Sequence, residues 1–333
     1  MKNNTLVQKR VVSLALTVFS TFAAFVPHTG FAAYPERAIR IVVPFPAGGG
    51  SDLAARVIAE PLMARMGQSV IVDNRPGGLT VIGHQNVASA PPDGYTLLLC
   101  TEDISSINAA YNAPLPYDPI KGFTFIAGIA EATLVLLAGP ESGIKNINDL
   151  ISKSKANPGK LSFASLGSNS PHFLFFEAFK QSAGLDLIDV PYKGTNEAVA
   201  AVVGKQVDLT LIGAATAARF AQTRGLVALA ATGNKRTPFA PTVATFGEFG
   251  YQDATLYSRF GLCGPAGMTQ DVAKKLQKAV LEIVHTPTAE KTLATIGLTP
   301  WATTGDDFLA STKRSTDKWK SVIQRIATGR STK

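Results

Sequence analysis

The stretch that most constrains this chain runs from Ile39 to Gly67, IRIVVPFPAGGGSDLAARVIAEPLMARMG. Its β-branched start predicts a buried strand. The glycines Gly48–Gly50 then predict a loop, and either Ser51 or Asp52 is a suitable N-cap for a helix after it. Strand, glycine loop and helix N-terminus together form a device that holds anions on free N–H groups. An ordinary βα turn rich in glycine has the same pattern, and this stretch alone leaves both readings open.

The nucleotide-binding versions of this device are excluded. No Gly-Lys-Ser/Thr follows the glycines, and Leu53 interrupts the dinucleotide fingerprint. The chain has four histidines and two cysteines, with no His-Glu-x-x-His, no Cys-x-x-Cys and no Gly-x-Ser-x-Gly. These few residues cannot supply a dense metal site, and nothing in their spacing calls for catalysis.

The same plan returns at Leu161–Gly184, LSFASLGSNSPHFLFFEAFKQSAG. A strand, Leu161–Ser165, leads into a Gly/Ser loop. Ser170 is the expected N-cap, because Pro171 after it fits the first helical position, and Gly184 is the expected C-terminal cap. His172 falls in the first turn, where it packs or caps more readily than it contacts a ligand.

Strands alternate with helices along the chain, which predicts a parallel sheet with crossover helices. In such sheets ligands bind at the carboxyl ends of strands. The strand Tyr95–Cys100 (YTLLLC) is followed by Thr101, Glu102 and Asp103, so these side chains are expected at the same edge as the glycine loop. The two acids also fit a simple pair of helix N-cap residues.

Other elements are expected from local patterns. After Asp103 the prolines at 114, 116 and 119 predict a long irregular stretch, which ends at a buried strand, Ala132–Ala138. The C-terminal part is predicted to be helical. Its three helices are Thr269–Val284, Pro287–Ile296 and Asp306–Ala327, the last anchored by Phe308, Trp319, Val322 and Ile326.

The N-terminus predicts a secretory signal peptide. Lys2, Lys9 and Arg10 precede an apolar run at 11–26, and a small-x-small site predicts cleavage near Ala32. An uncleaved anchor is the alternative, but the run is short for a membrane span. Removing these three positive charges from the net charge of +8 leaves +5. That mild excess, without a basic run, does not indicate nucleic-acid binding.

The cysteines are Cys100 and Cys263. An exported chain could pair them. Both end apolar runs, however, and buried free thiols are common. We therefore expect two buried thiols rather than a disulfide.

With both loops in view, the sequence resembles the tripartite tricarboxylate transporter substrate-binding proteins, the TctC-like or Bug receptors. The resemblance extends from about Tyr34 to Ile323 and rests on separated motifs in one order. These are YPERAIRIVVPFPAGGGSD, GQSVIVDNRPGG, PPDGYTLLL, KANPGKLSFASLGSNSPH, DVPYKGTNEAVAAVVGKQVDL and FGLCGPAGM.

The resemblance implies an α/β, two-domain periplasmic-binding-protein fold, type II-like, with a ligand cleft between the domains. It also implies a receptor that needs no cofactor and is not an enzyme. Domain 1 would be discontinuous, 33–131 plus 256–333, and domain 2 would be 132–255, after a signal peptide at 1–32. The strands near Ala132–Ala138 and Tyr257–Cys263 would cross between them. The ligand would be a small carboxylate, such as an organic, amino or aromatic acid.

The resemblance places the ligand between a loop of each domain, around Phe45–Gly49 and Gly167–Ser170. We expect Asp52 to hold the first loop rather than touch the ligand. The full set of expected ligand-site residues is Phe45, Pro46, Ala47, Gly48, Gly49, Asp52, Thr101, Glu102, Gly167, Ser168, Asn169, Ser170, His172, Tyr192, Thr195, Ala214 and Arg259.

The chain departs from its relatives where they determine the ligand. Cys100–Asp103 replaces a common Gly-Thr-Ser-Gly, Gly213–Ala215 stands where Asp and Asn are usual, and Arg259 lies near a usual aromatic position. Pro61 inside the first helix predicts a kink.

Buried acids need partners, and two arrangements supply them. In one, Arg259 pairs with Glu102 or Asp103. In the other, which the sequence favours slightly, an acid accepts a hydrogen bond from a ligand amine or ring N–H and Arg259 faces a second anionic group of the ligand.

The function implied by the resemblance is a periplasmic solute receptor that passes its ligand to membrane subunits of a tripartite transporter or to a sensor ectodomain. The protein is expected to be a monomer that binds no nucleic acid. The alternatives are a receptor-like protein that binds a protein partner without solute, and an exported enzyme on a similar fold.

Overall fold

The structure is a computed structural model that describes residues 34–330 except 79, 112–113 and 169. Residues 1–36 and 37–333 form two separate compact units, and only 34–36 of the first are described. The predicted signal peptide lies outside the described residues. A search of the described helices finds none long and apolar enough to cross a membrane.

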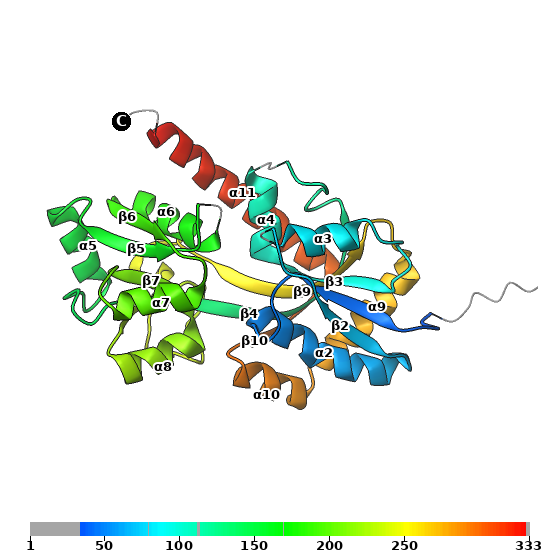
Figure 1. Ribbon diagram of the computed structural model, residues 1–333. Coiled ribbons are helices and arrows are strands. Elements are labelled where there is room, and N and C mark those ends of the chain that lie inside the picture. The colour runs from blue at the N-terminus through cyan, green and yellow to red at the C-terminus, as the bar shows by residue number, and fades with distance from the viewer. Residues whose placement is uncertain (1–33, 79, 112–113, 169, 331–333) are drawn as a thin grey trace, which may run out of the picture. The chain divides into compact units, whose positions relative to one another are not determined.

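Residues 37–333 form a mixed α/β unit around one continuous sheet (Figure 1). The strand order is β2-β1-β3-β9-β4-β7-β5-β6, with β8 and β10 also paired to β4. The strands are β1 Ile39–Val43, β2 Val70–Asn74, β3 Thr96–Thr101, β4 Phe123–Ala138, β5 Leu161–Ser165, β6 Leu187–Pro191, β7 Leu209–Gly213, β8 Val227–Ala231, β9 Tyr257–Pro265 and β10 Thr299–Thr304.

Helices connect and cover these strands. They are α2 Gly50–Met66, α3 Val81–Ala88, α4 Glu102–Tyr111, α5 Ile147–Ala156, α6 Pro171–Ala183, α7 Thr195–Val203, α8 Ala214–Arg224, α9 Gln270–Val284, α10 Pro287–Thr295 and α11 Gly305–Arg330. In the sheet β1 lies between β2 and β3, so the chain goes from β1 to the edge strand β2 and then crosses back past β1 to β3. Because both crossovers are right-handed but run in opposite directions, α2 and α3 lie on opposite faces of the sheet. Helices α9 and α10 pack against α2, and α11 packs against α4 (Figure 1).

The long strand β4 joins the two halves of the sheet. Its first part, 123–133, pairs with β9 and β10, and its second part, 134–138, pairs with β7 and β8. Strands β3 and β4 are both antiparallel to β9, and β1 is parallel to β3, so β1, β3 and β4 run in the same direction. β7 runs against β4, and β5 and β6 run parallel to β7. The carboxyl ends of β1 and β3 therefore face those of β5, β6 and β7 across the middle of β4.

Two apolar clusters stabilise the half that contains β5. One is rich in aromatic rings, in which Phe163 stacks on Phe176 at 4.0 Å and Phe246 packs edge-on against Phe175 and Phe179. It also includes Trp319 and Val322 of α11. Ile107 of α4 belongs to it as well. The expectation that Trp319 and Val322 are apolar anchors of the last helix is thus confirmed.

Several local predictions were wrong. Residues 102–111 form helix α4 rather than an irregular stretch, and β4 begins at Phe123 rather than Ala132. Helix α8 and strand β10 were not anticipated. Helix α2 is continuous across Pro61, and the kink expected there stays a prediction. The first half of β4 was missed because Gly128 and Glu131 interrupt its apolar pattern, although Gly128 leaves room for the Trp301 and Thr303 side chains of β10.

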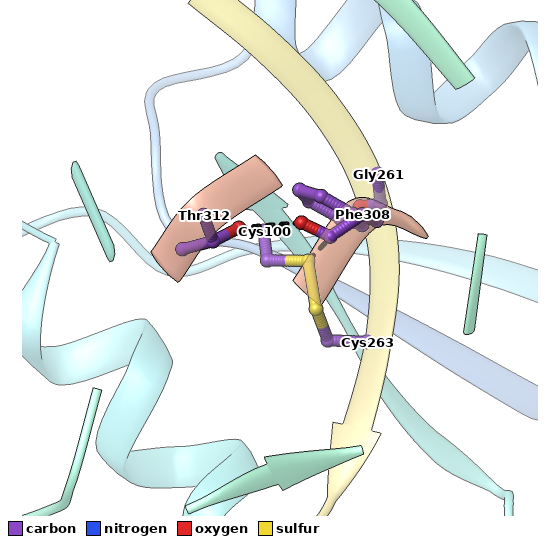
Figure 2. Close-up of a disulfide and its surroundings, with 5 residues drawn as sticks. All are labelled: Cys100, Gly261, Cys263, Phe308 and Thr312. Carbon is purple, nitrogen blue, oxygen red and sulfur yellow. Dashed lines mark hydrogen bonds between the residues drawn. A yellow bond between two sulfur atoms is a disulfide. The ribbon is translucent and has the colours of Figure 1, made fainter. Parts of the chain in front are cut away.

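The expectation of two free thiols was also wrong. Cys100 of β3 and Cys263 of β9 form a disulfide with a Cα–Cα distance of 6.0 Å, beneath Phe308 and Thr312 of α11 (Figure 2). The two strands are neighbours in the sheet, with Leu98 opposite Cys263 and Cys100 opposite Gly261. Because the bond links residues 163 apart, it removes chain entropy from the unfolded state.

Candidate functional site

The candidate site is built on the facing carboxyl ends of the strands. Thr101, the last residue of β3, pairs with Phe260, which pairs with Ala130 of β4. Gly213, the last residue of β7, pairs with Leu134 of the same strand. Four residues of β4 span roughly 13 Å at about 3.3 Å per residue. The two sets of strand ends are therefore close together, and five helices begin at them. Helices α2 and α4 follow β1 and β3 on one side, and α6, α7 and α8 follow β5, β6 and β7 on the other.

The glycine loop leads into the first of these helices. Pro46, Ala47, Gly48 and Gly49 are exposed and Phe45 is half-buried. Helix α2 begins at Gly50 with Gly49 as its N-cap, and no side chain caps it. The prediction that Ser51 or Asp52 is the N-cap was wrong, because the helix extends back into the glycines. Its first N–H groups remain available to an anion.

Asp52 holds the glycine loop from beneath. The residue is 2% exposed. Its Oδ2 accepts from the Gly48 N–H at 2.9 Å and from Arg56 Nε at 3.0 Å, and its Oδ1 accepts from Asn74 Nδ2 at 3.0 Å. Burial raises the pKa of Asp52, but the hydrogen bonds from Arg56, Gly48 and Asn74 outweigh burial, so the net pKa is lowered. The carboxylate is therefore occupied within the loop, as its expected supporting role requires.

The second loop leads into α6 as predicted. Ser170 is the N-cap, its Oγ accepts from the Phe173 N–H at 3.2 Å, and Pro171 occupies the first turn. Gly184 is the C-cap in the left-handed conformation. Gly167 has φ +98° and lies in open space, and Ser168 is exposed. The Ser168 carbonyl accepts from the Tyr111 hydroxyl at 2.9 Å. Asn169 lies outside the described residues.

His172 lies in the first turn of α6 and is neutral at pH 7. Burial lowers its pKa to about 4, only partly opposed by a hydrogen bond to the backbone of Leu211 in β7. Its Nδ1 is buried and has no hydrogen-bond partner among the described residues. These contacts fit a packing residue that ties α6 to β7.

Two further helices begin at this edge on glycine N-caps without a side-chain cap. They are α7, after Gly194, and α8, after Gly213. A Cβ placed on either glycine meets no atom within 4 Å, so the space before both helices is open. Thr195 and Ala214 are the first residues of these helices, and the Tyr192 N–H donates to the Ser165 carbonyl at the end of β5.

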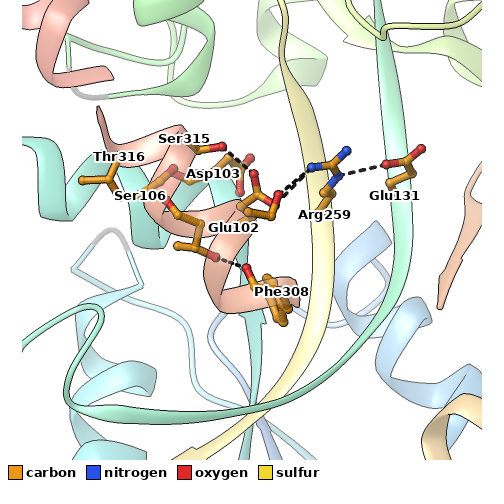
Figure 3. Close-up of polar contacts among 10 residues, drawn as sticks. Glu102, Asp103, Ser106, Glu131, Arg259, Phe308, Ser315 and Thr316 are labelled. Carbon is orange, nitrogen blue, oxygen red and sulfur yellow. Dashed lines mark hydrogen bonds and ion pairs between the residues drawn. The ribbon is translucent and has the colours of Figure 1, made fainter. Parts of the chain in front are cut away.

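The N-terminus of α4 differs, because it carries its own acids. Glu102 is 4% exposed and joins an ion-pair network with Arg259 of β9 (Figure 3). Arg259 Nη1 lies 3.3 Å from Glu102 Oε2, and Arg259 Nε donates to Glu131 of β4 at 2.9 Å. The guanidinium also lies over the rings of Tyr257, at 4.5 Å, and Trp301, at 4.7 Å.

The structure thus shows the first of the two predicted arrangements, in which Arg259 pairs with an acid. Arg259 is not free to face a ligand anion, as the slightly favoured arrangement required. The other half of that arrangement, an acid that accepts a hydrogen bond from a ligand amine, stays a prediction. Asp103 does not pair with Arg259. Its Oδ2 accepts from Ser258 at 2.9 Å and its Oδ1 accepts from the Ile104 N–H at 2.9 Å. Asp103 Oδ1 therefore accepts from an N–H of the first turn of α4, as a helix cap does. The residue is buried, however, whereas a simple cap would face solvent.

Three members of this network were missed from sequence. Ser311 and Ser315 of α11 donate to Glu102 at 2.8 and 2.5 Å, and Glu131 completes the ion pairs. Ser311 and Ser315 are four residues apart, on the helix face between Phe308 and Trp319. Hydroxyls at helical spacing along a buried face were the available signal of a polar partner.

The predicted site residues consequently separate into two groups. Those on the glycine loop, the α6 loop and the starts of α7 and α8 lie at the facing edges. Glu102 and Arg259 instead line a pocket of about 370 Å³ between α4, α11 and the start of β9, and neither loop lines that pocket. Thr101 is buried at the end of β3. Which of these residues touch a ligand stays a prediction.

Comparison with known proteins places the chain among periplasmic receptors. The family model described as tripartite tricarboxylate transporter family receptor matches residues 54–328. The periplasmic binding protein BugD is 30% identical, with a TM-score of 0.73, over 88% of this chain and 98% of BugD. R. palustris Rpa4515, solved with adipate, is 28% identical (TM-score 0.77, 87% and 97% covered). MatC from Rhodopseudomonas palustris, with bound malate, is 25% identical (TM-score 0.75, 87% and 100% covered).

These likenesses agree with the fold and with the order of motifs along the chain. The mixed α/β architecture is that of periplasmic binding proteins of the TctC and Bug type, which are solute-binding receptors. The chain belongs to the tripartite tricarboxylate transporter receptor family.

Proposed function

We propose that this chain is a periplasmic receptor that binds a small carboxylate between the facing strand edges. The observation that carries the proposal is that α2, α7 and α8 begin there on glycine N-caps with no side-chain cap. Helix N-termini carry partial positive charge and free N–H donors, which suit a carboxylate. Relatives with bound adipate and malate support this ligand class.

The two-sided arrangement suits a ligand with acidic groups at both ends. One carboxylate would meet the glycine loop and the start of α2. The other would meet Gly167–Ser170 and the starts of α7 and α8. The α4 N-terminus differs at this edge, because Asp103 already accepts from the Ile104 N–H there and its carboxylate repels an anion. The ligand is therefore directed away from α4.

Calorimetric titration with adipate and with malate tests the proposal. Gly49→Val and Gly213→Val add a side chain where the glycine has a negative φ, −80° and −55°. An added Cβ would meet the Pro46 carbonyl oxygen at 3.7 Å at position 49 and no atom within 4 Å at position 213. Both variants should fold. Each should obstruct the N–H donors, and losing two charge-assisted hydrogen bonds weakens binding by roughly 10²–10⁴-fold.

Gly247→Ala is the matched control, because an added Cβ there meets only Thr245 Oγ1 at 3.6 Å and lies outside both edges. It should bind as the unmodified protein does. Unchanged affinity in both valine variants would place the ligand elsewhere. No binding of any mono- or dicarboxylate by the unmodified protein would contradict the ligand class.

We further propose that the bound ligand is delivered to membrane subunits of a tripartite transporter, as the family name implies. Uptake of labelled ligand should then require both this chain and those subunits. Uptake that persists without the subunits would favour the alternative, delivery to a sensor ectodomain or another carrier.

A further inference from the structure

The pocket of about 370 Å³ behind Glu102 lies within the size range of small-molecule sites, about 300–1,000 Å³. Its walls come from five parts of the chain: α4, the start of β9, α11, the segment around Asn234 and the segment around Gln252. No residue of the two loops proposed to hold the carboxylate lines it. The pocket is therefore a candidate site separate from the proposed carboxylate site.

One wall carries a carboxylate, that of Asp103, which forms no ion pair with any cation in the described part of the chain. Glu102 is compensated, because both its oxygens accept hydrogen bonds and Arg259 pairs with it. Asp103 is different: the hydrogen bonds that it accepts come from neutral groups, the Ser258 hydroxyl, the Ile104 N–H and the Thr101 side chain. Burial, aided by the neighbouring Glu102 carboxylate, raises the pKa of Asp103 to about 6, against these three hydrogen bonds. Its charge is thus under-compensated.

The wall from α11 carries two cations, Arg314 and Lys318, that form no ion pair with any acid in the described part of the chain. Arg314 and Lys318 are four residues apart and line the pocket together. Within the described part of the chain Arg314 forms no ion pair, and Lys318 donates to the carbonyl of Thr255 rather than to an acid. Burial lowers the pKa of Lys318 to about 8, although Asp253 and Glu102 act to raise it. This ammonium is under-compensated too.

We propose that this pocket binds a small zwitterion of the α-amino acid type, with its ammonium on Asp103 and its carboxylate on Arg314 and Lys318. A simple anion would leave Asp103 buried without a cation. A simple cation would leave Lys318 without an anion. A ligand that carries both charges satisfies both walls, and the amides of Asn234 and Gln252 supply further polar contacts.

Thermal shift and calorimetry test this site with isosteric pairs. The twenty common amino acids are screened at about 10 mM, where mass action stabilises a protein that binds in its folded state. The 2-hydroxy acid analogues, lactate for alanine and malate for aspartate, replace the ammonium with a hydroxyl. At least one amino acid should bind, and its hydroxy analogue should bind this pocket at least tenfold more weakly. No binding by any of the twenty would overturn the proposal.

Measurements in the Gly213→Val background separate this pocket from the carboxylate site. Amino-acid binding should survive that substitution, whereas adipate binding should not. If the amino acid is instead lost in Gly213→Val and unaffected by Asp103→Asn, it occupies the carboxylate site and the present proposal fails while the receptor function stands. If amino-acid binding persists but no carboxylate binds, the proposed carboxylate site fails and this pocket stands.

Two variants address the walls directly. Asp103→Asn keeps the shape and Arg314→Gln removes an exposed, unpaired charge, so both should fold. Each should weaken amino-acid binding by roughly 10- to 100-fold, the effect of one charge-assisted hydrogen bond. Lys313→Gln is the control, since Lys313 is exposed next to Arg314 but does not line this pocket. Equal affinity in Asp103→Asn and the unmodified protein would contradict the assigned pose.

Discussion

Arg259 is placed between two carboxylates. The side chains of Glu102, Glu131 and Arg259 are 6%, 20% and 19% exposed, so solvent screens these charges only partly. Burial lowers the pKa of Arg259, but the two carboxylates outweigh burial and the net pKa is raised. The hydroxyls of Ser311 and Ser315 offset the excess negative charge at Glu102. Each partner is therefore costly to remove alone.

Glu102→Gln should destabilise the protein by roughly 1–3 kcal/mol. The amide keeps the shape and some hydrogen bonds but leaves Arg259 with Glu131 as its single acid. Urea unfolding measures the change in the free energy of unfolding. Glu131→Gln is the comparison and should cost less, because Glu131 is more exposed. If Glu102→Gln is neutral or stabilising, desolvation of the pair exceeds its attraction.

Asp103 gives a pH-dependent prediction. Its pKa in the folded protein, about 6, lies above the ordinary value of 3.8. The folded state therefore keeps a proton that the unfolded state releases between pH 4 and 6, and ionised Asp103 opposes folding above that window. Asp103→Asn should be more stable than the unmodified protein by roughly 1–3 kcal/mol at pH 7, and the difference should vanish near pH 4.

Urea unfolding of both proteins across pH 4–7 measures this difference. His84 and His172 have pKa values lowered by burial to about 4, so acidification from pH 6.5 destabilises both proteins equally and cancels in the comparison. Asp317→Asn on the exposed side of α11 should show no such trend. A difference that does not change with pH would show that Asp103 is not the titrating group.

For individual residues, the sequence predicted some side-chain partners and not others. A buried acid after a strand required a partner, and Arg259 was the strand cation that could supply it. Ser311 and Ser315 lie about 210 residues away from Glu102, so nothing local connected them with it. Asp52 was assigned a supporting role correctly, because its position beside three glycines gives it nearby N–H groups to accept from.

Helix α2 was predicted correctly as a helix, but its first residue was predicted wrongly. The apolar spacing after Ser51 indicates a helix. The start moved to Gly50 because Asp52 turns back to the Gly48 N–H instead of capping the first turn. The uncapped N-terminus that results is the feature on which the proposed carboxylate site depends.

Asp52→Asn should loosen this element. Roughly 1.5–3 kcal/mol of stability should be lost with the charged acceptor, and adipate should bind more weakly because the glycine loop is no longer fixed. Urea unfolding and calorimetry measure the two effects. Arg56→Gln is the control: its side chain is 52% exposed, so the ion pair itself is expected to contribute little. An equal loss in both variants would show that the ion pair, not the loop contacts, is what Asp52 supplies.

The disulfide and strand β10 could not be predicted from local sequence patterns, because both depend on which strands are neighbours in the sheet. Cys100 and Cys263 each end an apolar run, which indicates burial but does not say that β3 and β9 are neighbours. β10, TPWATT, has no regular alternation, and its place is determined by pairing with β4. Strands such as Leu161–Ser165 were predicted with their observed ends because turn residues bound them on both sides.

For the whole molecule, the two halves of the sheet are joined at β4 and β9. Glu131 and Thr133 pair with Arg259 and Tyr257 where β4 leaves one set of partners for the other. Packing of α6 against α4 and α11 provides a second link. The division into domains at 131/132 and 255/256 stays a prediction, and it implies that bending at these strands brings the facing edges together.

Ligand binding should therefore reduce the radius of gyration without changing secondary structure. A dicarboxylate that bridges α2 on one side and α6, α7 and α8 on the other is bound fully only when the edges approach, so it favours the closed state. Small-angle scattering with and without saturating adipate measures the change, with circular dichroism as the check on secondary structure. Gly213→Val, which should not bind adipate, should scatter identically in both conditions. An unchanged radius of gyration in the unmodified protein, with binding established by calorimetry, would show that the ligand is held without closure and that the strands at Arg259 are not a hinge.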